Sequence, residues 1–309
     1  EIRFEVNGTE RAVIDANSRI SLSNNDAGGT AGKDSTTGNT FFGYGVGGTI
    51  DANTINNTFI GHGSGDGSKS DAQANTGLGT YSLNSLTSGD SNVAVGYLAL
   101  EDLTSGTVNV AIGQQAGADL TTTGAIHNVI VGTQALYRAT TGAGYNVAIG
   151  SYAMGGNFTT ANVDSCVAIG YEALNGTLTT DATGTVAVGQ RAAKAITSGA
   201  GNTAIGFKAL TAENDGDHNT AVGYEALATQ NASDGDGQNT AVGFRAGKAV
   251  TTASGSTFLG NLAGGTLTTG NDNIAIGNDA MNGGVTTGDN NIAIGASAGD
   301  ALTSGYSNT

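Results

Sequence analysis

The side chains that could carry chemistry in this chain are few and scattered. His62, His127 and His218 lie in different segments and share no common spacing. Acid–base catalysis requires titratable groups that converge on one reacting atom. The sequence therefore predicts surface histidines, no catalytic residue and a protein that is not an enzyme. Cys166 is the one cysteine, so no disulfide can form within the chain.

Acidic residues gather in turn-like segments rich in glycine and serine. A calcium site needs several converging oxygen atoms, and no segment matches a complete EF-hand or a nonapeptide calcium repeat. The glycine-rich segments also lack the Gly-Lys-Ser or Gly-Lys-Thr ending of a phosphate loop. We expect solvated carboxylates and no metal, nucleotide or other cofactor; the acidic residues concerned are Asp66, Asp71, Asp215, Asp217, Asp234 and Asp236.

Composition excludes further classes of protein. The 309 residues include 52 Gly, no Pro and no Trp, and 11 Lys and Arg oppose 26 Asp and Glu, for a net charge of -15. Such a charge repels nucleic acid and anionic membrane surfaces. No apolar run approaches the roughly 20 residues needed to span a bilayer. We expect no nucleic-acid partner and no insertion into a membrane.

A repeat organises nearly the whole chain. A five-residue core ends in glycine at intervals of 17 to 20 residues, a period that suits one coil of a solenoid. Each coil is expected to contain a strand, a bend, a short second strand and a turn. The sequence thus predicts an all-β, parallel β-solenoid of about fifteen coils over residues 39–309; the core glycines are 43, 61, 79, 96, 113, 132, 150, 170, 189, 206, 223, 243, 260, 277 and 295.

Stacked coils place equivalent residues above one another, so each column of the repeat forms a ladder. The first column is mostly Asn, whose amides can bond along the stack. The third is mostly Ala, the fourth is always Ile, Val, Leu or Phe, and the fifth is Gly. Three repeats show the ladder residues most clearly: Asn109, Ala111, Ile112 and Gly113; Asn202, Ala204, Ile205 and Gly206; and Asn291, Ala293, Ile294 and Gly295.

Both faces of each strand are largely apolar. Adjacent strand residues point to opposite faces, and a coil of this length encloses only one thin interior. We expect the larger side chain, Ile205 in its repeat, to fill that interior. The other apolar face then requires a second surface, for which an identical chain is the simplest source. The pattern does not fix the number of copies.

The motif Asn-Val-Ala-Ile-Gly-x-x-Ala resembles the repeated unit in the heads of trimeric autotransporter adhesins. That resemblance implies a left-handed parallel β-roll in an intimately packed homotrimer, although the period here is longer. Residues 1–20 are similar to a segment that precedes such repeats in bacteriophage tail-fibre proteins. The resemblance implies a virion protein that forms the shaft of a tail fibre and supports attachment to the host. Its implied partners are a host-surface glycan or protein and other fibre or tail proteins.

Residues 1–38 read as a separate N-terminal element. Ile2, Phe4 and Val6 alternate with Arg3 and Glu5 before a turn at 7–8, which predicts a hairpin that caps the array or joins it to an upstream segment. At the other end, 308–309 look like the start of another coil. We therefore expect the array to continue beyond residue 309.

Four other readings fit less of the sequence. The closest rival is the head or stalk of a bacterial surface adhesin, or another extracellular filament, located at the cell surface. A hexapeptide acyltransferase fits one six-residue face but not the others. An ice-binding solenoid would need flat threonine arrays, whereas these turns vary in length and carry charge. A glycan-cleaving spike would need a recurring carboxylate pair.

Overall fold

The computed structural model describes residues 2–6, 9–14, 20–22, 38–121, 124–140, 143–157, 163–179, 182–232 and 237–309. The fold is all-β, with no helix in these ranges, and fifteen parallel strands form a β-solenoid of about 13 turns. The prediction of an all-β, parallel β-solenoid is confirmed, with slightly fewer turns than the fifteen coils expected and with one strand in each described coil in place of the two expected. The chain forms two compact units, Glu1–His127 and Asn128–Thr309, so the border between them lies inside the repeat array.

The first unit begins with a small antiparallel sheet. Strand β1 (Ile2–Val6) pairs with β2 (Thr9–Ile14), as the alternating pattern predicts, and β2 pairs with a third strand, β3 (Ile20–Leu22). The remainder of the predicted N-terminal element, up to residue 37, lies outside the described residues. Its role as a cap or joint stays a prediction.

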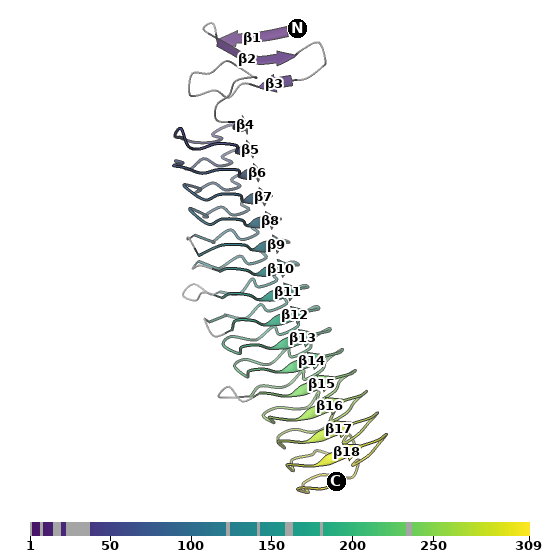
Figure 1. The fold of residues 1–309 in the computed structure, drawn as a ribbon. Helices are drawn as coiled ribbons and strands as arrows, with labels where there is room; N and C mark the ends of the chain where they lie inside the picture. Colours follow the sequence, from purple (N-terminus) through teal and green to yellow (C-terminus); the bar gives the residue numbers. More distant parts are fainter. Residues whose placement is uncertain are drawn as a thin grey trace. The chain divides into compact units, whose positions relative to one another are not determined.

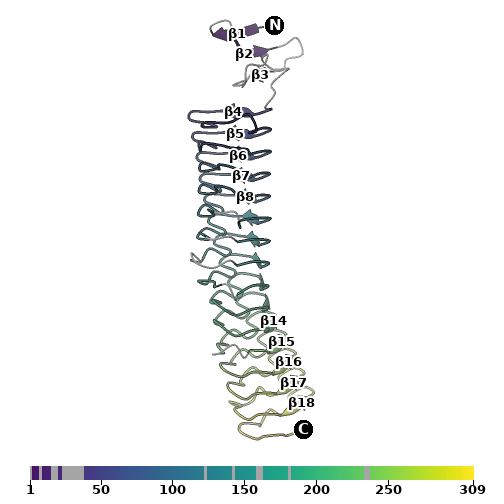
Figure 2. The same cartoon turned by 60° about the vertical axis from the view of Figure 1, so that its left-hand side comes forward.

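The strands of the solenoid are three residues long and follow one another in sequence order within each unit (Figures 1 and 2). The first unit contains β4 (Thr40–Phe42), β5 (Thr58–Ile60), β6 (Thr76–Leu78), β7 (Val93–Val95) and β8 (Val110–Ile112). The second unit contains β9 (Val129–Val131), β10 (Val147–Ile149), β11 (Val167–Ile169), β12 (Val186–Val188), β13 (Thr203–Ile205), β14 (Thr220–Val222), β15 (Thr240–Val242), β16 (Thr257–Leu259), β17 (Ile274–Ile276) and β18 (Ile292–Ile294).

Each coil has two walls, which the coil of β13 illustrates. The strand is one wall, and the residues after the core glycine, here 207–211, form a return segment that is the other. Gly206 makes the bend with a φ of 136°, and a Cβ atom there would clash with the backbone oxygen of Gly223 in the next coil. On the return segment, Lys208 and Leu210 have φ values of 52° and 53°. This left-handed backbone turns the chain tightly without a helix.

Backbone hydrogen bonds join both walls to the neighbouring coils. In the strand wall, the Thr203 N–H donates to the Asn219 oxygen at 2.8 Å. In the return wall, the Leu210 N–H donates to the Ala226 oxygen at 2.9 Å, and the Lys208 N–H donates to the Gln190 oxygen at 3.0 Å. Each coil is therefore held along the stacking direction on two sides.

The interior of a coil is thin, because each wall contributes only one layer of side chains to it. The second strand residue points inward, and the return residue six positions later is buried opposite it, as in the fully buried Ala204 and Leu210. Where the strand supplies a Phe, the return segment supplies a Gly: a Cβ atom on Gly65 would lie only 2.8 Å from the Phe59 ring. In these three coils a large strand side chain thus faces a residue without one; the pairs are Phe41 and Gly47, Phe59 and Gly65, and Phe258 and Gly264.

The expectation that Ile205 fills the interior is wrong. Ala204 is fully buried, whereas Ile205 is 39% exposed and points out of the coil. The physical reason is the thinness of the interior, which a small strand residue and a Leu from the opposite wall already fill. Asn202 lies two residues before Ala204 and shares its inward face, so the buried amide and the alanine go together.

Candidate interchain surface

The outward-pointing strand residues form a repeated apolar surface, which we call the outer strand face and define as the first and third residues of β4 to β18. The first residue of each strand is Thr, Val or Ile, and the third is Phe, Ile, Leu or Val. Third residues such as Ile112 and Leu259 are 42% and 46% exposed in the single chain. In each unit, every coil therefore presents an aliphatic or aromatic side chain to its surroundings, at the spacing of neighbouring strands, roughly 4.8 Å.

Behind this surface, the asparagine ladder fixes how the coils stack. The Asn202 side-chain oxygen accepts from the Asn219 backbone N–H at 2.9 Å and from the Asn219 amide at 3.1 Å. The Asn202 amide donates to the Gly216 oxygen at 2.8 Å, which ties the strand to the turn before the next strand. Both asparagines are fully buried. These bonds satisfy polar groups that burial would otherwise leave unpaired.

The same geometry occurs at the other two marked repeats. Asn109 bonds to the Asn92 oxygen through its backbone N–H and its amide, both at 3.0 Å. Asn291 contacts the Asn273 oxygen in the same way, at 2.9 and 3.0 Å. The remaining ladder residues lie in equivalent places: Ala111 is fully buried and Ala293 is 6% exposed, Ile112 and Ile294 point outward, and Gly113 and Gly295 have φ values of 137° and 128°.

Three coils replace the ladder asparagine. Cys166 is fully buried, and its Sγ contacts the Ala182 oxygen at 3.2 Å, the kind of turn oxygen that asparagine amides reach elsewhere. Burial raises the pKa of this thiol to about 11, so the thiol stays protonated and unreactive at neutral pH. The other exceptions, Thr185 and Ser256, are also buried. The column therefore tolerates small polar residues that bond to the same neighbours.

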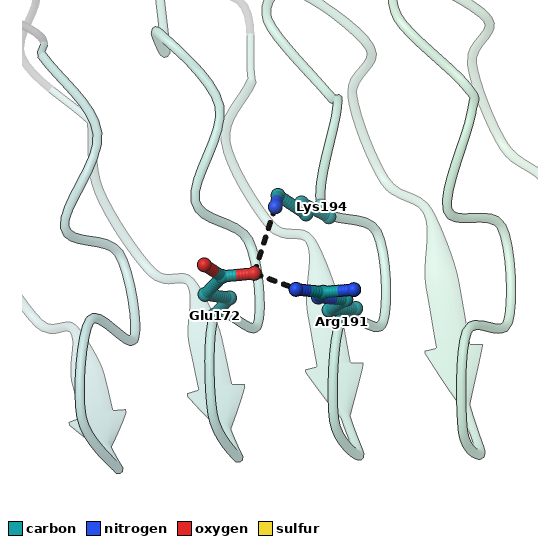
Figure 3. A network of polar contacts seen from close by, with 3 residues as sticks. All are labelled: Glu172, Arg191 and Lys194. Atoms are coloured by element: carbon teal, nitrogen blue, oxygen red, sulfur yellow. Dashed lines mark hydrogen bonds and ion pairs between the residues drawn. The ribbon is translucent and has the colours of Figure 1, made fainter.

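The return wall carries ion pairs that the repeat pattern does not reveal. A carboxylate oxygen of Glu172 lies 2.8 Å from Arg191 and 2.7 Å from Lys194, both in the next coil (Figure 3). Lys194 and Arg191 hold the pKa of Glu172 below its ordinary value, against the opposing effect of partial burial.

The arrangement recurs three coils later, where Glu225 lies 2.9 Å from Arg245 and 2.8 Å from Lys248. Hydrogen bonds from Lys248 and Arg245 likewise lower the pKa of Glu225. The signal that could have found these contacts is the identical placement within the repeat, Glu two residues after one core glycine, then Arg two residues after the next and Lys three residues further on.

The chemistry-bearing residues of the sequence do not come together in the described part of the chain. His62 packs between the rings of Tyr44 and Tyr81, at 5.4 and 5.2 Å between ring centroids. Among the described residues, no group of three or more His, Cys, Asp and Glu could hold a metal ion. The predicted turn carboxylates Asp234 and Asp236 lie outside the described residues.

The described residues include no helix long and apolar enough to cross a membrane. The feature that recurs throughout is instead the outer strand face, an exposed apolar surface with the period of the backbone. Exposed apolar surfaces of this extent usually mark contacts between proteins. No protein-family model, curated protein or solved structure matches the chain.

Proposed function

We propose that the chain is the shaft of a bacteriophage tail fibre, built as a homotrimer of left-handed solenoids that pack through their outer strand faces. The observation that carries the proposal is the outward-pointing apolar column, half-buried or exposed in every coil from β4 to β18. Left-handedness and the number three come from the resemblance of the Asn-Val-Ala-Ile-Gly repeat to trimeric adhesin heads.

A second copy of the chain suits this surface better than an unrelated partner. The outer strand face repeats once per coil, and only a surface with the same period can match it along its whole length. Three copies in parallel orientation would bury all three faces against one another and remove their apolar side chains from water. The polar turns and return walls would stay outside.

The proposed role is mechanical. Backbone bonds on two walls resist bending and extension, the buried asparagines fix the stacking of coils, and interchain packing excludes water from the shaft. Turns and return walls are then available for a host-surface glycan or protein, while the ends would join other fibre or tail proteins. None of these tasks requires a metal or a cofactor.

The head or stalk of a bacterial surface adhesin is the alternative, because the same repeat resembles both classes of protein. Antibodies raised against the purified chain distinguish them when applied to virions and cells from a culture that carries the gene. Gold label along the virion tail fibres is the expected result. Label on the bacterial surface together with unlabelled virions would contradict the fibre proposal and favour the adhesin.

A further inference from the structure

Basic residues are concentrated in one part of this acidic chain. Of the 11 Lys and Arg residues, five lie between residues 191 and 248. All five are on the return segments that follow β12, β13 and β15. We call this set, with three neighbouring aromatic rings, the basic strip: Arg191, Lys194, Lys208, Arg245 and Lys248, with Phe207, Tyr224 and Phe244.

The three aromatic side chains form a stack along the solenoid. The Phe207 and Tyr224 ring centroids are 5.0 Å apart and those of Tyr224 and Phe244 are 5.5 Å apart, with interplanar angles of 18° in both pairs. Each ring therefore covers a face of its neighbour and leaves its edge toward solvent, with Tyr224 and Phe244 both 43% exposed. Ring edges carry the positive part of the aromatic quadrupole.

Cations lie against the rings of this stack. The Lys208 ammonium lies 5.2 Å from the Phe207 ring centroid, and the Arg245 guanidinium lies 4.9 Å from Phe244 and 5.9 Å from Tyr224. The ion pairs leave the strip positive, because Glu172 and Glu225 are each shared by two cations and Lys208 has a ring as its neighbour. Five cations thus face two carboxylates in a chain whose net charge is -15.

We propose that the basic strip binds an acidic polysaccharide, a polyuronate chain lying along the solenoid with its carboxylates against the cations and ring edges. The cations lie on the return segments that follow β12, β13 and β15, with Glu225 on the one that follows β14, so a linear polyanion along the solenoid can meet several of them. Single-stranded nucleic acid fits less well, because bases bind through open aromatic faces, and these faces cover one another. This proposal names the class of the host-surface glycan in the proposed function. Binding of a polyuronate can be tested independently of the fibre proposal, and only the biological role of that binding rests on it.

Calorimetric titration of the full chain with alginate oligosaccharides, a linear polyuronate, tests this site. Binding is expected at low ionic strength and should weaken in 0.15 M salt, since exposed charges are screened within roughly 8 Å there. Arg191→Gln combined with Lys208→Gln should lower affinity about tenfold, because each exposed ion pair contributes only modestly. Lys208→Arg should retain binding, because the charge is kept.

The control is Arg138→Gln, which removes one exposed cation that also lies near an aromatic ring, 5.8 Å from Tyr137, but outside the strip. Affinity for alginate should stay within twofold of the unmodified chain. Equal binding by the double variant, no alginate binding at low salt, or tighter binding of a single-stranded oligonucleotide would each overturn the inference. Sedimentation of the same samples reports the trimer separately, so failure here is distinguishable from failure of the shaft.

Discussion

At the residue scale, the buried asparagines contribute most directly to coil stacking. Asn202 uses its side-chain oxygen twice and its amide once, and each bond reaches the next coil or the turn leading to it. Their role could be predicted from sequence because one amide supplies both donors and acceptors at a position that repeats along the chain. The asparagine column thus stacks equivalent residues of successive repeats above one another.

Replacing Asn202 should test this role. Asn202→Ala leaves the Asn219 N–H, the Asn219 amide and the Gly216 oxygen without their partner, at a cost of about 3 kcal/mol in unfolding free energy. Asn202→Ser should cost less, since Ser256 in the same column accepts from the Asn273 N–H at 3.1 Å. Thermal unfolding followed by circular dichroism compares the two, and equal losses would show that the hydrogen bonds contribute little.

The carboxylate of Glu213 makes the free energy of unfolding depend on pH. The residue is fully buried, and its carboxylate accepts from the Asn214, Gly216 and Ala232 N–H groups at 3.0, 2.8 and 3.3 Å. Burial raises its pKa above the ordinary value of 4.5 despite these bonds, so the folded chain binds its proton more tightly than the unfolded chain. The contribution of this group to stability is therefore greatest below pH 4.5 and is lost as the pH rises through the folded pKa.

Glu213→Gln removes this titration. As the pH rises from 4 to 7, the free energy of unfolding of the variant should increase relative to that of the unmodified chain. This change is expected whatever the difference between the two proteins at pH 4. Chemical denaturation at both pH values measures the change. If the difference in unfolding free energy between variant and unmodified chain stays constant, the hydrogen bonds balance the effect of burial on the pKa of Glu213. If the variant instead loses stability relative to the unmodified chain, they outweigh it. Either result would contradict a raised pKa.

At the element scale, the strand parity and not the size of the side chain decides what lies inside a coil. The repeat period, the strand positions and the apolar nature of both faces could be predicted from the sequence. The outward position of Ile205 could not, because it depends on how much space the opposite wall of the coil leaves for a strand side chain. The pairs Phe258 with Gly264 and Ala204 with Leu210 show how the residue on the opposite wall limits the space for the strand side chain.

A double-mutant cycle tests wall compensation. Phe258→Ala should cost about 3–5 kcal/mol by opening a cavity, and Gly264→Leu alone should also destabilise, because its side chain would overlap the Phe258 ring. The two changes together should recover much of the loss. Leu210 and Leu227 already adopt φ values of 53° and 48° in this column, so the backbone accepts leucine there. Additive losses in the double variant would refute compensation.

At the scale of the whole molecule, the coils carry two different surfaces, which the sequence alone does not distinguish. The outer strand face is apolar and repeats in every coil, whereas the return wall varies and carries the charges. Ion pairs such as Glu172 with Arg191 depend on which residues meet in successive coils, so they become visible only when the repeats are aligned coil by coil. Assembly should therefore depend on the first surface and tolerate changes on the second.

Ile205→Asp tests that division. Because Ile205 is exposed in the single chain, the coil should still fold, but a charge buried between chains costs about 3 kcal/mol or more per copy and should dissociate the trimer. Gln190→Glu adds the same charge at an exposed position beyond the bend and should leave assembly intact. Sedimentation velocity reports the assembly, and circular dichroism reports the fold. A trimeric Ile205→Asp variant would place the interface elsewhere.

The mass of the purified, unmodified chain in solution tests the central claim most directly. If the outer strand faces pack against copies of themselves, light scattering coupled to size-exclusion chromatography should give close to three times the subunit mass of 30.3 kDa at low micromolar concentration. The trimer should persist on dilution, because each of its coils would contribute apolar side chains to the interface. A stable species of 30.3 kDa under these conditions would contradict the account.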